Sequence, residues 1–446
     1  MRNDLIIGLD IGSSHVRAVA GKLNGGKLDI IATGKSNTTG FLLHGDIVNI
    51  HKTSAAISDA ISQIESVIGS KNKDFYFSSN LSGSHINVQP FSISKLRKNP
   101  NDAVSEKEIF DLNEEAKKTI GEKHPCVLHR LPIGFTVGNL PETMEPVGQI
   151  GPKIQGDYMV VTASFDKFEL FKKSLRAAES EHIKGGNLYF SPLATSSTVL
   201  SAEEKQEGVA LVDIGSGTTE ISVYVNKRLT HATVLNWGGD RITEDIKIGL
   251  DVSAEHAEAL KIRFGSALHK EIDIHEIVMI PGIAGRKPIP VSVKNLAIII
   301  EERAKELAAI VLAEISKVTN PETLRGGIVL VGGGAQLPDI SELFQRSTDI
   351  DTRVGIPNAG SNQFAIAEEI KDPSYATAIG LVQVYFDQVA DVESEGELVD
   401  ALESSPEATR FEGPSGGSST KPPGIKNIFN RIVDTLMGGN EEVGEY

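Results

Sequence analysis

Two stretches far apart in the chain share one pattern: an apolar strand, an aspartate at its tip and a turn of small residues. The first stretch, residues 5–14, carries Asp10, and the second, residues 211–220, carries Asp213. Apolar and polar residues alternate after each turn, as expected of a half-buried strand. The repeat therefore predicts a duplicated α/β protein whose two halves close on one ligand.

Both turns have the composition of a phosphate cradle. Small residues leave their backbone N–H groups open to a ligand, and the hydroxyl groups add further hydrogen bonds. A carboxylate beside a phosphate needs a cation between them, and Mg²⁺ held through its water shell is the natural candidate. The predicted phosphate-binding residues are Gly12, Ser13 and Ser14 in the first turn, and Gly215, Ser216, Gly217, Thr218 and Thr219 in the second.

Composition restricts the class of protein. A chain of 446 residues is too long to pack around one hydrophobic core, so we expect several folded domains. The share of hydrophobic residues, 40%, is typical of a globular protein. The net charge of −16 argues against nucleic acid as a partner. Cys126 is the only cysteine, which indicates a reducing cytosol. We expect no signal peptide, because the first apolar run is short and ends at Asp10. No apolar stretch approaches the ~20 residues that span a bilayer.

Strand and helix patterns divide the chain into two core halves, each interrupted by an insertion. The pattern of the first half stops near residue 80 and resumes at 160, and the pattern of the second half is interrupted by a run of helices. The expected boundaries are 1–80 and 160–200 for the first core, 81–159 for its α+β insertion, 201–229 and 325–390 for the second core, and 230–324 for the second insertion.

Beyond residue 390 the composition becomes acidic and rich in Pro, Ser and Gly. Residues 391–423 cannot bury a core and are expected to be a disordered linker. Residues 424–437 then place apolar side chains at helical spacing, which predicts an amphipathic helix about 20 Å long. A helix docked on its own domain is the simpler alternative, but Lys426 and Arg431 suit anionic lipid, and the linker favours a separate surface. The apolar stripe is Ile425, Ile428, Phe429, Ile432, Val433 and Leu436.

Three motifs together resemble the actin/Hsp70/sugar-kinase superfamily: Asp10-Ile-Gly-Ser-Ser, Asp213-Ile-Gly-Ser-Gly-Thr-Thr and Val331-Gly-Gly-Gly-Ala. Other runs are similar to the FtsA family of bacterial cell-division proteins. This resemblance covers residues 1–390 and the terminal helix, and it implies an actin-like fold of two ribonuclease-H-like halves around a nucleotide cleft. The runs that carry it are Gly83-Ser-His-Ile, Pro146-Val-Gly, Ser191-Pro-Leu-Ala, Ala257-Glu-Ala-Leu-Lys-Ile-Arg-Phe-Gly265 and Tyr375-Ala-Thr-Ala-Ile-Gly380.

The resemblance assigns roles to individual residues. Asp10 and Asp213 would flank Mg²⁺, and Arg17 stands where relatives keep a phosphate-contacting lysine, although an ordinary arginine on a surface strand is the alternative. Glu258 and Lys261 match a pair that contacts the nucleoside of ATP, whereas a pair at this spacing is usually a solvated helix face. The other expected nucleotide contacts are Gly239, Asp240, Gly332, Gly333 and Gly334.

One position departs from the family. Relatives commonly carry Glu or Gln in the Pro-Leu-Ala helix, where that side chain orients the water that attacks ATP, and here the residue is Ser197. A hydroxyl group is short and is not basic at neutral pH. We therefore expect ATP binding with weak or absent hydrolysis.

The resemblance also implies a cellular function. Members of the family anchor the FtsZ ring to the cytoplasmic face of the bacterial inner membrane at the division site, assemble into filaments and contact other division proteins. Arg303 matches a family position on the face that docks the FtsZ C-terminal tail, and Lys294 is a further basic residue of the same predicted helix. The alternative is that Arg303 simply pairs with Glu302 or Glu306. An actin-fold adaptor of pilus assembly and a sugar-kinase-like phosphotransferase are the competing functions, and the tethered helix argues against the kinase.

Overall fold

The computed structural model describes residues 5–69, 75–179, 183–270, 272–281, 287–359 and 364–394. The predicted terminal helix at 424–437 and nearly all of the predicted linker at 391–423 lie outside these residues. Helix α11 (Ala376–Ser394) continues through the first residues of that linker, so the predicted boundary at 391 falls inside a helix.

The first half is built on five strands with helices on both faces. The strands are β1 (Ile6–Ile11), β2 (His15–Asn24), β3 (Lys27–Asn37), β6 (Phe75–Leu81) and β10 (Ile183–Phe190), in the sheet order β10-β6-β1-β2-β3. Helix α1 (Ile50–Ile68) packs Ile57, Ile61 and Ile64 on one face, together with α3 (Phe165–Arg176). The opposite face is covered by α11.

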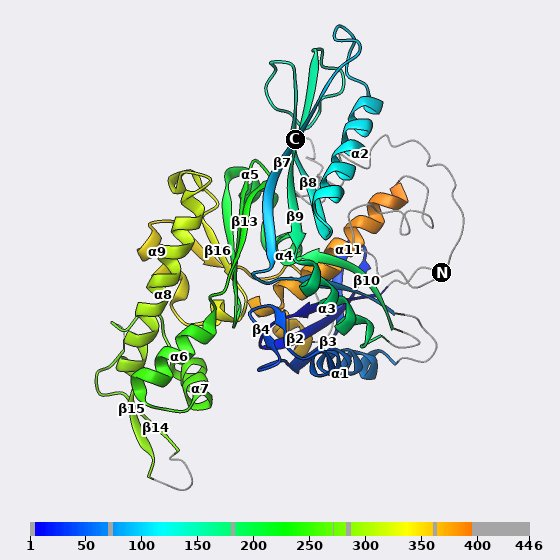
Figure 1. Ribbon diagram of the computed structural model, residues 1–446. Coiled ribbons are helices and arrows are strands. Elements are labelled where there is room, and N and C mark those ends of the chain that lie inside the picture. Colours follow the sequence, from blue (N-terminus) through cyan, green and yellow to red (C-terminus); the bar gives the residue numbers. More distant parts are fainter. Residues whose placement is uncertain are drawn as a thin grey trace.

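The second half repeats the first. Its strands are β11 (Val209–Ile214), β12 (Thr219–Val225), β13 (Arg228–Leu235), β16 (Ile328–Val331) and β17 (Thr352–Val354), in the order β13-β12-β11-β16-β17. In each half a central strand pairs antiparallel with the next strand of the chain and parallel with a later one. The predicted duplication is therefore confirmed, and Figure 1 shows the two sheets side by side with α4 (Ser191–Val199) between them.

The first insertion is a separate small sheet covered by one helix. It consists of β7 (Ile86–Leu96), α2 (Glu106–Lys123), β8 (Val127–Val137) and β9 (Lys153–Ala163), with β9 in the middle of the sheet. The predicted return to the first core at residue 160 is wrong, because β9 stays paired with both neighbours to its end. Cys126, the residue before β8, is buried. This inserted subdomain lies at the top of Figure 1.

The second insertion consists of α6 (Gly239–Leu250), α7 (Ala254–Phe264), β14 (Ile277–Ile280), β15 (Ile289–Ser292) and the first turns of α8 (Val293–Ser316). The predicted start at residue 230 is wrong because it falls inside β13, a strand of the second sheet. The predicted end of the insertion at 324 is also too late, since Leu307 and Val311 of α8 already pack on the second sheet. Helix α9 (Ile340–Thr348) covers the same face through Phe344.

The remaining elements are short connections. They are β4 (Leu42–Leu43), β5 (Asp46–Ile47), α5 (Ala202–Glu207), α10 (Phe364–Glu369) and the 3-10 turns η2 (Pro321–Thr323), η3 (Gly333–Gln336) and η4 (Pro373–Tyr375). None of the helices in the described part of the chain has the length and hydropathy needed to cross a membrane.

Candidate functional site: the cleft between the two halves

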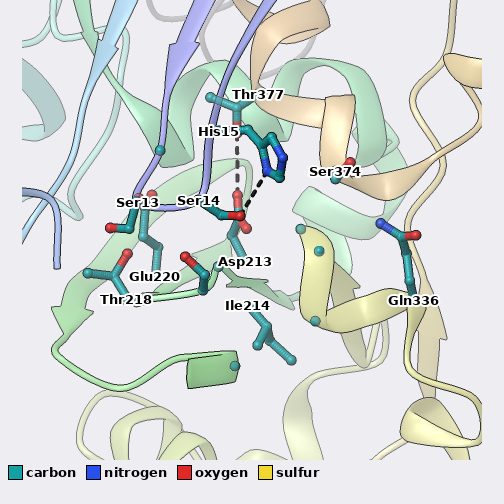
Figure 2. Close-up of a pocket in the computed structure, with 18 of the residues that line it drawn as sticks. Ser13, Ser14, His15, Asp213, Ile214, Thr218, Glu220, Gln336, Ser374 and Thr377 are labelled. Atoms are coloured by element: carbon teal, nitrogen blue, oxygen red, sulfur yellow. Dashed lines mark hydrogen bonds between the residues drawn. The ribbon is translucent and has the colours of Figure 1, made fainter. Parts of the chain in front are cut away.

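The two Asp-tipped hairpins face each other across a cleft of about 430 Å³. Sixteen of the eighteen residues predicted to contact nucleotide line this cleft, together with groups from η3, η4 and α11 (Figure 2). The lining residues that the sequence predicted are Asp10, Gly12, Ser13, Ser14, Arg17, Asp213, Gly215, Ser216, Gly217, Thr218, Gly239, Glu258, Lys261, Gly332, Gly333 and Gly334.

Two predicted residues are not among the lining. Thr219 is fully buried, and its hydroxyl donates to the Trp237 carbonyl at 2.6 Å, so it supports the turn from behind. Asp240 is the second residue of α6, and its backbone N–H donates to the Ser216 carbonyl at 2.8 Å. Both residues hold the second turn in place, and neither side chain lines the cleft.

The turns are tight because each closes on its own backbone. The Gly12 N–H donates to the His15 carbonyl at 3.1 Å, and the Gly215 N–H donates to the Thr218 carbonyl at 2.9 Å. The three-glycine loop packs directly on the second turn. A Cβ at Gly332, whose φ is 82°, would lie 2.2 Å from an Asp213 carboxylate oxygen, so this approach requires glycine.

Burial dominates the electrostatics of the two aspartates. It raises the pKa of Asp10 to about 7, against the opposing effect of Arg17, and it raises the pKa of Asp213 to about 6. Asn80 orients Asp10 by donating to its Oδ1 at 2.8 Å, while Thr377 donates to Asp213 Oδ2 at 3.3 Å (Figure 2). The floor of the cleft therefore favours a cation, which would stabilise both carboxylates in their ionised form.

Glu220 is a third buried carboxyl group that the sequence analysis did not assign to the site. It pairs in register with Asp213, and burial followed by the Asp213 charge raises its pKa. One carboxylate oxygen accepts a hydrogen bond from Ser82, and the other is buried without a hydrogen-bond partner among the described residues. The sequence could have indicated this residue. Glu220 is the last residue of the second motif, on the strand that follows the turn and runs back beside Asp213.

Arg17 lies in the cleft, which excludes the alternative of an ordinary surface arginine. It pairs in register with Asp10, and its guanidinium lies 5.6 Å from the centre of the Tyr375 ring. Its Nε atom is buried and makes no hydrogen bond within the described part of the chain. Lys35, opposite Arg17 on β3, also lines the cleft and was missed. The cleft therefore presents cationic groups toward an anionic ligand.

Glu258 and Lys261 also line the cleft and do not form a solvated helix face. Their charged groups lie 2.7 Å apart, and the Lys261 ammonium donates to the Gly239 carbonyl at 3.0 Å and to the Thr243 hydroxyl at 2.7 Å. These contacts join α7 to the start of α6 at the opening of the cleft.

Ser197 takes no part in the lining. Its hydroxyl donates to the Ala194 carbonyl at 2.7 Å, one turn earlier in α4, and lies against α11. The Ser197 hydroxyl therefore makes its hydrogen bond within α4, on the side that faces α11, and does not reach the nucleotide turns.

The two predicted partner residues lie on α8, outside the cleft. Arg303 pairs with Asp245 and with Glu306, and its guanidinium lies 6.0 Å from the centre of the Trp237 ring. Lys294 is nine positions earlier, about two and a half turns, so the two residues leave opposite sides of the helix. The structure does not bring them together into one patch.

A repeated sheet in each half, with an Asp-tipped hairpin from each on the floor of a shared cleft, defines an actin-like protein. Solved structures show the same fold. The PilM-PilN type IV pilus biogenesis complex is similar with a TM-score of 0.58 at 19% identity, covering 84% of this chain and 97% of that chain. MreB5 of Spiroplasma citri bound to ADP has a TM-score of 0.52 at 14% identity, with 88% and 99% covered.

Sequence comparison identifies the family. The family described as "Cell division protein FtsA" matches residues 210–380, and the "SHS2 domain inserted in FTSA" matches residues 83–162. Cell division protein FtsA of Bacillus subtilis is 31% identical, covering 85% of this chain and 83% of the relative, and that of Escherichia coli K12 is 30% identical, covering 85% and 89%. The chain belongs to the FtsA family of cell-division proteins.

Proposed function

We propose that the cleft binds ATP together with Mg²⁺. The observation that carries this proposal is the pair of facing hairpins, with small-residue turns for the phosphates and two partly buried aspartates where a cation would bind. Two structures of the actin-like MreB5 are described as bound to ADP and to AMPPNP, which supports a nucleotide in a cleft of this fold. Arg17 and Lys35 supply positive charge toward the phosphates.

The residues of the cleft fit the cation. No group of three or more His, Cys, Asp or Glu in the described residues is arranged to hold a metal ion directly, so Mg²⁺ would bind through its water shell and the phosphates. The raised pKa values of Asp10 and Asp213 and the unpartnered oxygen of Glu220 mark a place where positive charge is lacking. When bound, the ion neutralises phosphate charge. Asn80 and Thr377 hold the two aspartates in position.

Hydrolysis is expected to be slow. No Glu or Gln stands at position 197, and the Ser197 hydroxyl is engaged within its own helix pair. The nucleotide would then act mainly as a clamp that stabilises the closed cleft, in proportion to its concentration relative to its dissociation constant.

Calorimetry of Mg²⁺-dependent ATP binding tests the proposal. We expect Asp213→Asn to weaken binding by tenfold or more, because it removes a charge that the cation compensates. Asp111→Asn, an exposed substitution on α2 away from the cleft, is the matched control and should bind as the unmodified protein does. Equal affinity in the Asp213 variant and the control would remove the cleft assignment.

In the cell, the chain would act as a membrane-tethered actin-like adaptor. It would anchor the FtsZ ring to the cytoplasmic face of the inner membrane, assemble into filaments and contact other division proteins. Membership of the FtsA family supports this role over pilus assembly and over a sugar kinase. Attachment would use the amphipathic stripe of residues 424–437.

For the FtsZ C-terminal tail, Arg303 is the residue to test. Its side chain already pairs with Asp245 and Glu306, so charge reversal alone would also disturb this surface. Glu306→Gln removes one of these ion pairs while leaving the cation, and it should keep or strengthen binding of a fluorescent tail peptide. Arg303→Glu should abolish peptide binding with ATP affinity unchanged. If both variants bind peptide equally, Arg303 is not part of the docking site.

A further inference from the structure

A short segment of the first half contacts both phosphate turns. It consists of residues 44–46, from the residue after β4 to the first residue of β5, and is called the clasp. His44 Nδ1 lies 2.7 Å from the Gly217 carbonyl oxygen, and because a carbonyl only accepts, the ring donates. The Gly45 N–H donates to the Ser13 hydroxyl at 3.2 Å. The clasp therefore makes one hydrogen bond to each of the two turns.

The backbone of the clasp is confined. His44 has φ of 52° and Gly45 has φ of 82°, and the first value is uncommon for a residue with a Cβ. Such a conformation persists only where the surroundings require it. A Cβ at Gly217 would lie 2.9 Å from Ser13 Oγ and 3.0 Å from the backbone nitrogen of His44, so no space is left between the two turns and the clasp.

The other side of the clasp packs on the root of the inserted subdomain, where the chain leaves and re-enters the first core. A Cβ at Gly45 would lie 2.5 Å from Gly83 Cα. Asp46 pairs with Lys167 of α3 at 2.8 Å, and its other oxygen lies 3.3 Å from His85 Nδ1. The outgoing and returning strands are joined here, since the Ser164 N–H donates to the His85 carbonyl at 3.1 Å.

A second contact ties the same root to the second half. The Ser82 hydroxyl, at the end of β6, donates to the Glu220 carboxylate on the second hairpin. The root of the inserted subdomain is therefore held to the second phosphate hairpin at two points, directly through Ser82 and through the clasp at Gly217.

We infer that His44 is a positioning residue that couples the cleft to the inserted subdomain. A change in the second turn is passed through the His44–Gly217 hydrogen bond to Gly45 and from there to Gly83. The orientation of the inserted subdomain, and the surface it offers to partners, then depends on what the cleft holds. The dependence on nucleotide rests on the proposed function; the mechanical link between the turn and the root does not.

Hydrogen exchange measured on the full chain by mass spectrometry tests the link. In the absence of nucleotide, His44→Ala should raise the exchange rate of segments that contain the Ile86 and Ser164 amides about three- to tenfold, the effect of one lost hydrogen bond. His44→Asn should restore protection, because its Nδ2 occupies the place of the ring Nδ1 and Asn tolerates positive φ. His51→Ala, an exposed histidine at the start of α1, is the matched control.

The outcomes separate the two proposals. Unchanged exchange in His44→Ala, or an Asn variant that exchanges as fast as the Ala variant, overturns the link. Addition of Mg²⁺ and ATP should slow exchange at the root of the unmodified protein and have less effect on His44→Ala. If calorimetry shows that ATP binds while exchange at the root does not respond, the coupling is overturned. If ATP does not bind but His44→Ala still loosens the root, the proposed function fails and the link stands.

Discussion

Single side chains set the electrostatic character of this protein. Asp10 and Asp213 are partly buried at the cleft and Glu220 is buried, and desolvation raises the pKa of each carboxyl group. A carboxyl group whose pKa is raised in the folded state loses its proton at a lower pH in the unfolded chain. These groups therefore destabilise the folded state increasingly as the pH rises above their pKa values in the unfolded chain. A bound cation would remove this cost, which makes the cleft a site where ligand binding and stability are linked.

His129 has the opposite effect on stability, and we predict a measurable acid sensitivity from it. The ring is buried, accepts the Phe190 N–H at 2.9 Å, and has a pKa lowered by burial to about 3. The unfolded chain takes up this proton near pH 6.5 and the folded chain does not, so stability is present above pH 6.5 and is lost as the pH falls toward 3. At pH 5 the loss from this residue is about 2 kcal/mol.

Urea unfolding at pH 7 and pH 5 measures the effect. His129→Gln keeps an acceptor for the Phe190 N–H but does not titrate, so its stability should change less between the two pH values by about 2 kcal/mol. The same loss in both proteins would show that His129 is not responsible.

At this scale the sequence predicts the residues that belong to a local motif. Both aspartates and seven of the eight small turn residues could be identified as cleft residues from the repeated pattern alone. The exception is Thr219, which lies behind the second turn. Asn80 and Thr377 could not be identified, because they reach the aspartates from β6 and α11, far away in the chain. Glu220 could have been, from the two-residue alternation of its strand.

At the scale of elements, the helix pair α4 and α11 joins the two halves at very close range. Gly380 of α11 lies against α4, where a Cβ would be 1.9 Å from the Ala194 carbonyl oxygen. The hydroxyl of Thr195 on α4 also lies 2.8 Å from that of Thr377, the residue that contacts Asp213. Any separation of these helices therefore displaces a residue of the cleft.

We predict that Gly380→Ala destabilises the protein by about 1–3 kcal/mol or more, because the new methyl group must push the helices apart. Gly121→Ala in α2 is the matched control, since nothing lies within 4 Å of its Cβ and alanine is the better helix former. That control should be neutral or stabilising by up to about 1 kcal/mol. Equal midpoints of chemical denaturation for the two variants would contradict the close packing.

Element types were predicted better than element ends. The two Asp-tipped hairpins follow from their apolar strands and the alternation after each turn. The boundaries at 160 and 230 were wrong because β9 and β13 continue as long as a partner strand is available, and the partner is not visible in local sequence. Helix α8 belongs to both an insertion and a core, a division that no local pattern indicates.

At the scale of the whole molecule, we predict that membrane attachment depends on the apolar stripe near the end of the chain. Phe429→Glu with Ile432→Glu should abolish co-sedimentation with anionic liposomes and leave ATP binding unchanged, because the stripe can no longer enter the acyl boundary. Asn427→Glu with Asn430→Glu adds the same charge to the polar positions and should reduce binding only in part. Loss of binding in both to the same extent would indicate a purely electrostatic attachment. Filaments would strengthen a weak single anchor by presenting many copies.

Helix α11 has a consequence for how such a protein can be varied. It begins beside the cleft, with Thr377, and its last described turn at Ser394 is about 25 Å away along the helix axis. A segment joined after Ser394 is therefore attached to the end of α11 that lies farthest from the cleft residue Thr377. We expect tails of different length, charge or anchoring chemistry to be exchangeable at this junction, because the point of attachment is remote from the nucleotide-binding residues.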